Sequence, residues 1–165
     1  MKDVSIMIDD VKFNLRAGIM ITCNDEVLVE VNPNLDFVTL PGGRVHALEN
    51  TKETLIREMT EEMNFELPDT IKLRGIIENF FEFDEKKYHE LYFLYKYDIK
   101  NDSKLYSDNM INEDSKKTYF KWVKKNELDR VNLLPSILRE WALSDGFDQA
   151  TINDLPIKGK SKINK

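Results

Sequence analysis

Four charged residues, Arg57, Glu58, Glu61 and Glu62, lie close together in the chain. On an α-helix the three glutamates stand at positions i, i+3 and i+4, so their carboxylates are expected to project from one face, opposite the apolar stripe. Arg57 lies one turn from both Glu53 and Glu61 and is expected to pair with and orient them. Two carboxylates roughly 4 Å apart repel by about 4 kcal/mol at an effective dielectric of about 20, so a partly buried cluster needs a cation. Carboxylate oxygens favour Mg²⁺ or Mn²⁺. From charge alone, a solvated acidic face is the competing interpretation.

The helix that carries these carboxylates is predicted over residues 51–63, where apolar side chains recur every three or four positions. Asn50 is expected to be its N-cap, with Glu53 completing a capping box. Asn64 is expected to end the helix in the left-handed conformation, and Pro68 prevents continuation. The apolar stripe consists of Leu55, Ile56, Met59 and Met63.

Residues 43–65 resemble the box of the Nudix (MutT-like) hydrolase family, in which fixed residue types recur at fixed spacing. The family pattern is Gly, five residues, Glu, seven residues, Arg-Glu, an apolar residue, any residue, Glu-Glu, any residue, Gly and an apolar residue. Asn64 replaces the final Gly, and Asn is the next best residue for a left-handed helix end. After the paired glycines, close relatives often read Glu-any-Gly-Glu, whereas residues 46–49 read His-Ala-Leu-Glu. The matching residues are Gly43, Glu49, Arg57, Glu58, Met59, Glu61, Glu62 and Phe65, preceded by the family-like LPGG.

The resemblance implies a fold, a reaction and a set of residue roles. The fold is an α/β/α sandwich with a mixed β-sheet. The reaction is hydrolysis of the diphosphate bridge in a nucleoside diphosphate linked to another group X, by water that Mg²⁺ or Mn²⁺ activates. The implied metal ligands are Glu58, Glu62 and the backbone carbonyl of Gly42, with Glu61 holding a second metal or its bound water, Glu49 assisting and Arg57 orienting.

Three further residues are candidates for substrate contacts. Arg44 follows the paired glycines and can clamp a phosphate, with a surface ion pair as the equal alternative. Phe81 belongs to a group of hairpin aromatics of which one could stack on a nucleobase, although such residues more often form core or cross-strand pairs. Family members often draw a further carboxylate from the loop before an apolar-Trp-apolar strand, which is Glu113 or Asp114 here. Ordinary loop solvation is the alternative for that carboxylate.

The composition restricts the class of protein and its partners. The chain has 165 residues with 24 Lys+Arg against 30 Asp+Glu, a net charge of −6, and is 41% hydrophobic. One globular domain is therefore expected, as a monomer or homodimer, and the acidic balance argues against nucleic acid as a partner. No apolar run approaches the roughly 20 residues of a membrane span. A single cysteine, Cys23, and a polar start of the chain predict a cytoplasmic protein.

Strands and one more helix are expected to surround the acidic helix in a single α/β domain, residues 1–150. Polar residues 101–118 predict a loop, and SILREWAL after Pro135 predicts a short helix. Residues 151–165 carry four lysines near their end and predict a basic, flexible C-terminal tail. The predicted strands are VSIMI, FNLRAGIMITC, VLVEV, FVTL, IKLRGIIENFFEF, YHELYFLYKYDI and TYFKWV.

Three functions remain in competition at this level. The leading one is a metal-dependent pyrophosphohydrolase acting on a small nucleotide-derived substrate. The second is a catalytically impaired Nudix-fold module that binds nucleotides or regulates, because residues 46–48 depart from the family loop. The third, an enzyme acting on a capped or triphosphorylated RNA end, needs a basic path that the composition does not supply.

Overall fold

A twisted, mixed β-sheet runs through the computed structural model, which describes residues 1–155. Most neighbouring strands are antiparallel, but β2 pairs with β7 and β10 pairs with β6 in parallel. The strand order along the sheet is β10-β6-β7-β2-β3-β9-β8, with β1 and β5 on β2 and β4 on β3. The elements are β1 (Ser5–Ile8), β2 (Val11–Cys23), β3 (Glu26–Val31), β4 (Val38–Thr39), β5 (Gly42–Arg44), α1 (Thr51–Met63), β6 (Lys72–Phe83), β7 (Lys86–Asp98), β8 (Met110–Ile111), β9 (Tyr119–Lys124), the 3₁₀ turn η1 (Lys125–Glu127), α2 (Ile137–Trp141) and β10 (Asp148–Asn153).

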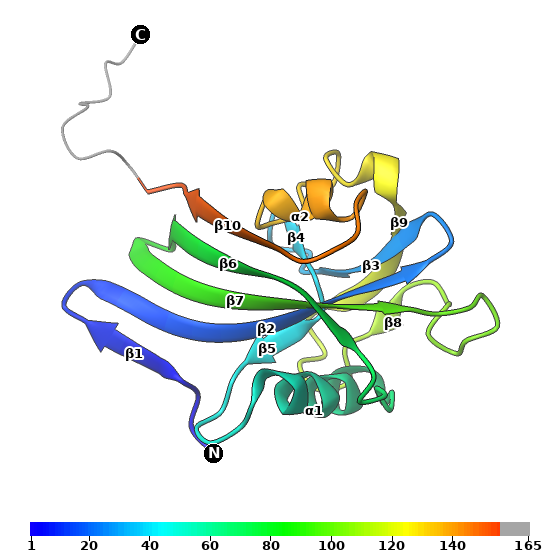
Figure 1. Cartoon of the computed structure of the whole chain (residues 1–165), viewed down its shortest axis with the longest axis horizontal. Helices are drawn as coiled ribbons and strands as arrows, with labels where there is room; N and C mark the ends of the chain where they lie inside the picture. Colours follow the sequence, from blue (N-terminus) through cyan, green and yellow to red (C-terminus); the bar gives the residue numbers. More distant parts are fainter. Residues whose placement is uncertain (156–165) are drawn as a thin grey trace, which may run out of the picture.

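The two helices cover opposite faces of the sheet (Figure 1). Successive side chains of a strand point to opposite faces, so β2 and β3 contribute to both apolar layers. Burial on both faces explains why their sequences read as nearly continuous apolar runs. The predicted α/β sandwich with a mixed sheet is confirmed. The layer beneath α1 is built around Ile19, Leu28, Leu55 and Met59, and the layer beneath α2 around Met20, Val29, Leu138 and Trp141.

A fork between β2 and β3 makes room for the loop that precedes α1. The two strands pair only at Thr22↔Val27 and Cys23↔Glu26 and then diverge. Residues 38–44 enter the fork, where β4 pairs with β3 and β5 pairs with β2. Gly42 has a φ of 144°, and a Cβ added there would lie 2.2 Å from the backbone oxygen of Ala17. Only glycine therefore lets the loop lie this close to β2.

Both ends of α1 form as the sequence predicts. The Asn50 side chain accepts hydrogen bonds from the backbone N–H groups of Lys52 and Glu53, and Glu53 accepts one from the Asn50 N–H in return. Asn64 ends the helix with φ 48° and ψ 43°, in the left-handed region. The bounds of the acidic helix are thus set by local chemistry at its two ends.

The C-terminal part differs from the sequence expectation. The boundary predicted between residues 150 and 151 falls inside β10, because residues 148–153 pair in parallel with β6. This polar edge segment, DQATIN, lacks the apolar content that identifies a strand from sequence. The two-residue β8 lies within the predicted loop, and α2 is shorter than SILREWAL. The lysine-rich end of the predicted tail lies outside the described residues. No helix of residues 1–155 has the length and apolarity to span a membrane.

Candidate active site

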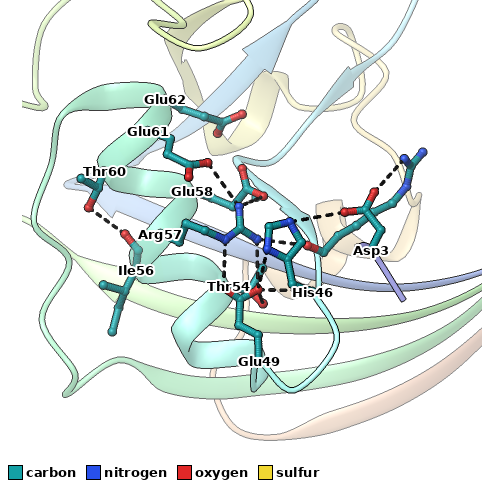
Figure 2. A network of polar contacts seen from close by, with 12 residues as sticks. Asp3, His46, Glu49, Thr54, Ile56, Arg57, Glu58, Thr60, Glu61 and Glu62 are labelled. Atoms are coloured by element: carbon teal, nitrogen blue, oxygen red, sulfur yellow. Dashed lines mark hydrogen bonds and ion pairs between the residues drawn. The ribbon is translucent and has the colours of Figure 1, made fainter. Parts of the chain in front are cut away.

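Arg57 is the centre of a network of carboxylates around the start and middle of α1 (Figure 2). Its Nε donates to Glu49 Oε1 at 2.9 Å and its Nη2 to Glu49 Oε2 at 3.0 Å. Its Nη1 donates to Glu58 Oε1 at 2.8 Å and to Glu61 Oε2 at 3.2 Å. The two-pronged contact lowers the pKa of Glu49 to about 2, chiefly through the Arg57 hydrogen bonds. Arg57 therefore joins the loop glutamate to the helix glutamates.

The three helix glutamates differ sharply in burial. The Glu61 side chain is 48% exposed and that of Glu58 is 14% exposed, while Glu62 is 8% exposed as a whole residue. The expectation that all three face away from the apolar stripe is wrong, since Glu58 and Glu62 turn toward the sheet beside it. The expected pair between Arg57 and Glu53 is also absent, because Glu53 is used in the capping box.

Glu62 carries a buried carboxyl group whose charged form its surroundings stabilise poorly. Its Oε1 accepts a hydrogen bond from Asn112 Nδ2 at 3.0 Å. Its Oε2 is buried and has no hydrogen-bond partner among the described residues. Burial, followed by repulsion from Glu30, raises the pKa of Glu62 to about 8. Asn112 also donates to Glu30 Oε1 at 3.2 Å, so the two carboxylates share one amide. A buried oxygen without a partner is costly unless a proton or a cation satisfies it.

The surroundings of Glu62 fit a divalent metal ion. Gly43 lies against Glu58 so closely that an added Cβ would be 1.9 Å from its Oε1. The Gly42 carbonyl lies in the same fork and accepts a hydrogen bond from Arg16 Nη2 at 3.3 Å. Within residues 1–155 no three acidic, His or Cys side chains already converge as a metal-binding group. The donors are nevertheless all oxygens, which suits Mg²⁺ or Mn²⁺.

A cavity of about 590 Å³ opens on the α2 face of the sheet, next to this cluster. Arg16 and Glu30 belong to both places, because they line the cavity and also contact Gly42 and Asn112. Phe81 lines the cavity and stacks on Tyr88 with ring centres 4.8 Å apart. Phe81, a candidate for stacking on a nucleobase, therefore lies in the cavity wall. It also forms a cross-strand pair, which was the alternative interpretation of this residue. Polar groups on the sheet floor are Arg16, Asn79, Glu90 and Tyr92, and aromatic walls come from Phe37, Phe81 and Phe83.

The other two residues predicted to contact the substrate are Arg44 and Glu113. Arg44 forms an ion pair with Asp3 at 3.3 Å on the surface, and only its backbone oxygen reaches Arg57. Glu113 is exposed and forms an ion pair with Lys116 at 2.7 Å, while its backbone N–H donates to the Glu62 backbone oxygen at 2.8 Å. For both residues the structure shows the surface ion pair and no side-chain contact with the acidic cluster.

The loop that departs from the family pattern is held by the N-terminal segment. His46 Nε2 lies 3.4 Å from Asp3 Oδ1, and its backbone N–H donates to Glu49 Oε2 at 3.1 Å. The Ala47 N–H donates to the Lys2 backbone oxygen at 2.9 Å. Leu48 takes the left-handed conformation with φ 69°. Glu49 thus reaches Arg57 without the glycine that close relatives often have in this loop.

Sequence reasoning missed Arg16, Glu30, Glu90 and Asn112. A signal existed for Arg16 and Glu30, because each is a charge between two apolar residues of a strand. Glu90 lies in a strand with several other charged residues, so its charge alone does not distinguish it. Asn112 lies in a long polar loop, where nothing distinguishes it from its neighbours.

The sequence profile of the NUDIX domain matches residues 12–142. The chain belongs to the Nudix family. Among solved structures, the MutT protein of Bacillus halodurans shares 19% identity at a TM-score of 0.63, covering 86% of this chain and 91% of that one. The MutT Nudix hydrolase of Burkholderia pseudomallei shares 16% identity at a TM-score of 0.60, covering 80% and 98%. No curated protein matches the chain. As the sequence predicts, this Nudix family member is a Nudix-type hydrolase.

Proposed function

We propose that this Nudix protein is a divalent-metal-dependent pyrophosphohydrolase that cleaves the diphosphate bridge of a nucleoside diphosphate linked to a moiety X. The observation that carries the proposal is the buried Oε2 of Glu62, which has no partner among the described residues and lies in an acidic, oxygen-rich fork. A cation satisfies that oxygen and offsets the repulsion between Glu62, Glu30 and Glu58. Such a cation also neutralises part of the diphosphate charge, which an acidic protein otherwise repels.

The residues around the fork take distinct roles in this proposal. Glu58, Glu62 and the Gly42 carbonyl hold Mg²⁺ or Mn²⁺, and the more exposed Glu61 holds a second ion or its water. A bound ion neutralises phosphate charge and activates the attacking water. Arg57 keeps Glu58 and Glu61 in place through its Nη1 contacts. The bidentate Glu49 contact fixes the Arg57 guanidinium in turn.

The adjacent cavity accommodates the nucleoside part of the substrate. Its volume of about 590 Å³ lies within the range of small-molecule sites. Apolar aromatic walls and a few polar floor groups are the usual composition of such sites. The proposed partner is therefore a small nucleotide derivative rather than a nucleic acid.

The proposal includes a cytoplasmic location, because the single cysteine, Cys23, is buried and has no second cysteine to pair with.

The test is a Mg²⁺-dependent screen of nucleoside diphosphate derivatives, with products identified by mass spectrometry. Glu58→Gln, Glu61→Gln and Glu62→Gln are each expected to lower turnover roughly 100-fold or more, about 2.7 kcal/mol of transition-state stabilisation. Glu66→Gln, an exposed glutamate just after the helix, is the matched control and should retain wild-type turnover. Wild-type rates in the three variants would refute the assignment. Nucleotide binding without turnover of any diphosphate would instead favour the Nudix-fold binding or regulatory module.

A further inference from the structure

The floor of the cavity contains a carboxyl group that the proposed hydrolysis does not use. Glu90 on β7 and Asn79 on β6 are register partners in the sheet, and both line the cavity. They are 8% and 7% exposed, respectively. Their neighbours in the next row on the same face are Tyr92 and Ile77. A charged side chain at this depth needs partners for its oxygens.

Glu90 is only partly satisfied by the protein. Asn79 Nδ2 donates to its Oε1 at 3.5 Å, the upper limit of a hydrogen bond, and no described residue donates to its Oε2. The positive charge of Arg16 lies near and lowers the pKa of Glu90, but burial has the larger effect and raises it. Arg16 itself donates to the Gly42 carbonyl. The cavity floor thus presents a carboxylate oxygen that can accept hydrogen bonds from a ligand.

The aromatic side chains around the cavity favour a flat ligand above the Glu90 Oε2 atom. Phe37 and Phe83 meet edge to face with ring centres 6.0 Å apart, and Phe81 lies along the same wall region. Aromatic walls with a hydrogen-bond acceptor at the floor suit a heteroaromatic ring whose edge carries N–H donors.

We propose that Glu90, assisted by Asn79, is a specificity-determining residue that selects nucleobases carrying an exocyclic amino group. The inference rests on the proposed function, because it assumes that the nucleoside part enters this cavity. Adenine, cytosine and guanine each offer an amino N–H to Glu90 Oε2. Uracil and hypoxanthine place a carbonyl oxygen where adenine and cytosine have the amino group, and that oxygen faces the carboxylate with like polarity. A buried acceptor left unpaired by the wrong ligand is the strongest basis for such rejection.

The experiment compares matched nucleotide pairs that differ only in this group. Dissociation constants of cytidine against uridine diphosphate, and of adenosine against inosine diphosphate, are measured by calorimetry with EDTA present. The buffer is held at pH 8.5 to favour the ionised form of Glu90. The wild type is expected to bind the amino member of each pair at least tenfold more tightly, about 1.4 kcal/mol. Glu90→Gln, whose amide can donate to a carbonyl, should bring both ratios within twofold of unity or reverse them.

Two controls make the result decisive. Glu78→Gln removes a charge from β6, the strand of Asn79, but on the opposite, exposed face, and should leave both ratios unchanged. The ratios of dissociation constants within each nucleotide pair are measured first on the wild type. They therefore test the proposal even if Glu90→Gln folds poorly. Equal binding within each pair by the wild type would overturn the proposal, whether or not the protein hydrolyses diphosphates. Discrimination in binding without any hydrolysis would support it while refuting the proposed function.

Discussion

Replacing Glu62 with glutamine tests the buried carboxyl on which the proposed metal site depends. Glutamine preserves the shape of the side chain and an oxygen for the Asn112 amide, but it cannot ionise. In the metal-free wild type, burial and the nearby Glu30 raise the pKa of Glu62 from 4.5 to about 8. The native state therefore holds this proton more tightly than the unfolded chain does.

The sign and size of the effect follow from that difference. Between pH 4.5 and about 8 the unfolded chain releases the proton while the native protein keeps it, so stability falls as pH rises. Each pH unit crossed costs about 1.4 kcal/mol, so the free energy of unfolding should drop on the order of 5 kcal/mol over the interval. The Glu62→Gln variant should lack this decline and be more stable than the wild type at pH 8.

The assay is urea unfolding in EDTA at a series of pH values from 5 to 9, followed by melting curves with added Mg²⁺. Because a metal binds the deprotonated carboxylate, Mg²⁺ should stabilise the wild type more at pH 8 than at pH 6. Glu62→Gln should reduce that shift. Parallel stability profiles for wild type and Glu62→Gln in EDTA would refute the assignment of a raised pKa to this residue.

Three other changes test the elements that hold the site. Glu49→Gln should be less stable than the wild type at pH 7 and about equally stable near pH 2, which denaturation at both pH values checks. The reason is that the Arg57 contact lowers the pKa of Glu49 to about 2, so its stabilising effect is lost as the carboxylate protonates. Gly43→Ala should reduce kcat/KM at least tenfold, about 1.4 kcal/mol, since its Cβ would lie 1.9 Å from Glu58 Oε1; unchanged kinetics would contradict the close packing. Asn64→Gly should be neutral or mildly stabilising, whereas Asn64→Val should lose about 1–2 kcal/mol in a urea melt, because β-branched residues resist the left-handed conformation.

The acidic helix could be predicted from the sequence because its determinants are local. Asn50 and Glu53 are three residues apart and complete the capping box between themselves, and Asn64 ends the helix within one turn of its last apolar residue. Fixed spacing within one helix also brings Arg57 to Glu61, four residues further along.

The cavity could not be predicted in the same way, because it depends on strand register. Arg16 faces the cavity because β2 pairs in parallel with β7, a strand more than sixty residues away along the chain. The antiparallel register of β6 and β7 places Glu90 opposite Asn79. A sequence shows that such charges lie within predicted strands, but a shift of one residue in pairing would turn each of them to the other face.

In the proposed site, Arg16 would make metal binding and nucleotide binding thermodynamically dependent on each other. Its guanidinium lines the cavity and also donates to the Gly42 carbonyl, the backbone oxygen assigned to the metal. A nucleotide that draws Arg16 toward itself releases that carbonyl, and a metal that takes the carbonyl releases Arg16. Each ligand then raises the affinity for the other by the same factor, since such coupling is reciprocal. The single hydrogen bond between Arg16 and Gly42 would thus couple the proposed substrate recognition to metal binding.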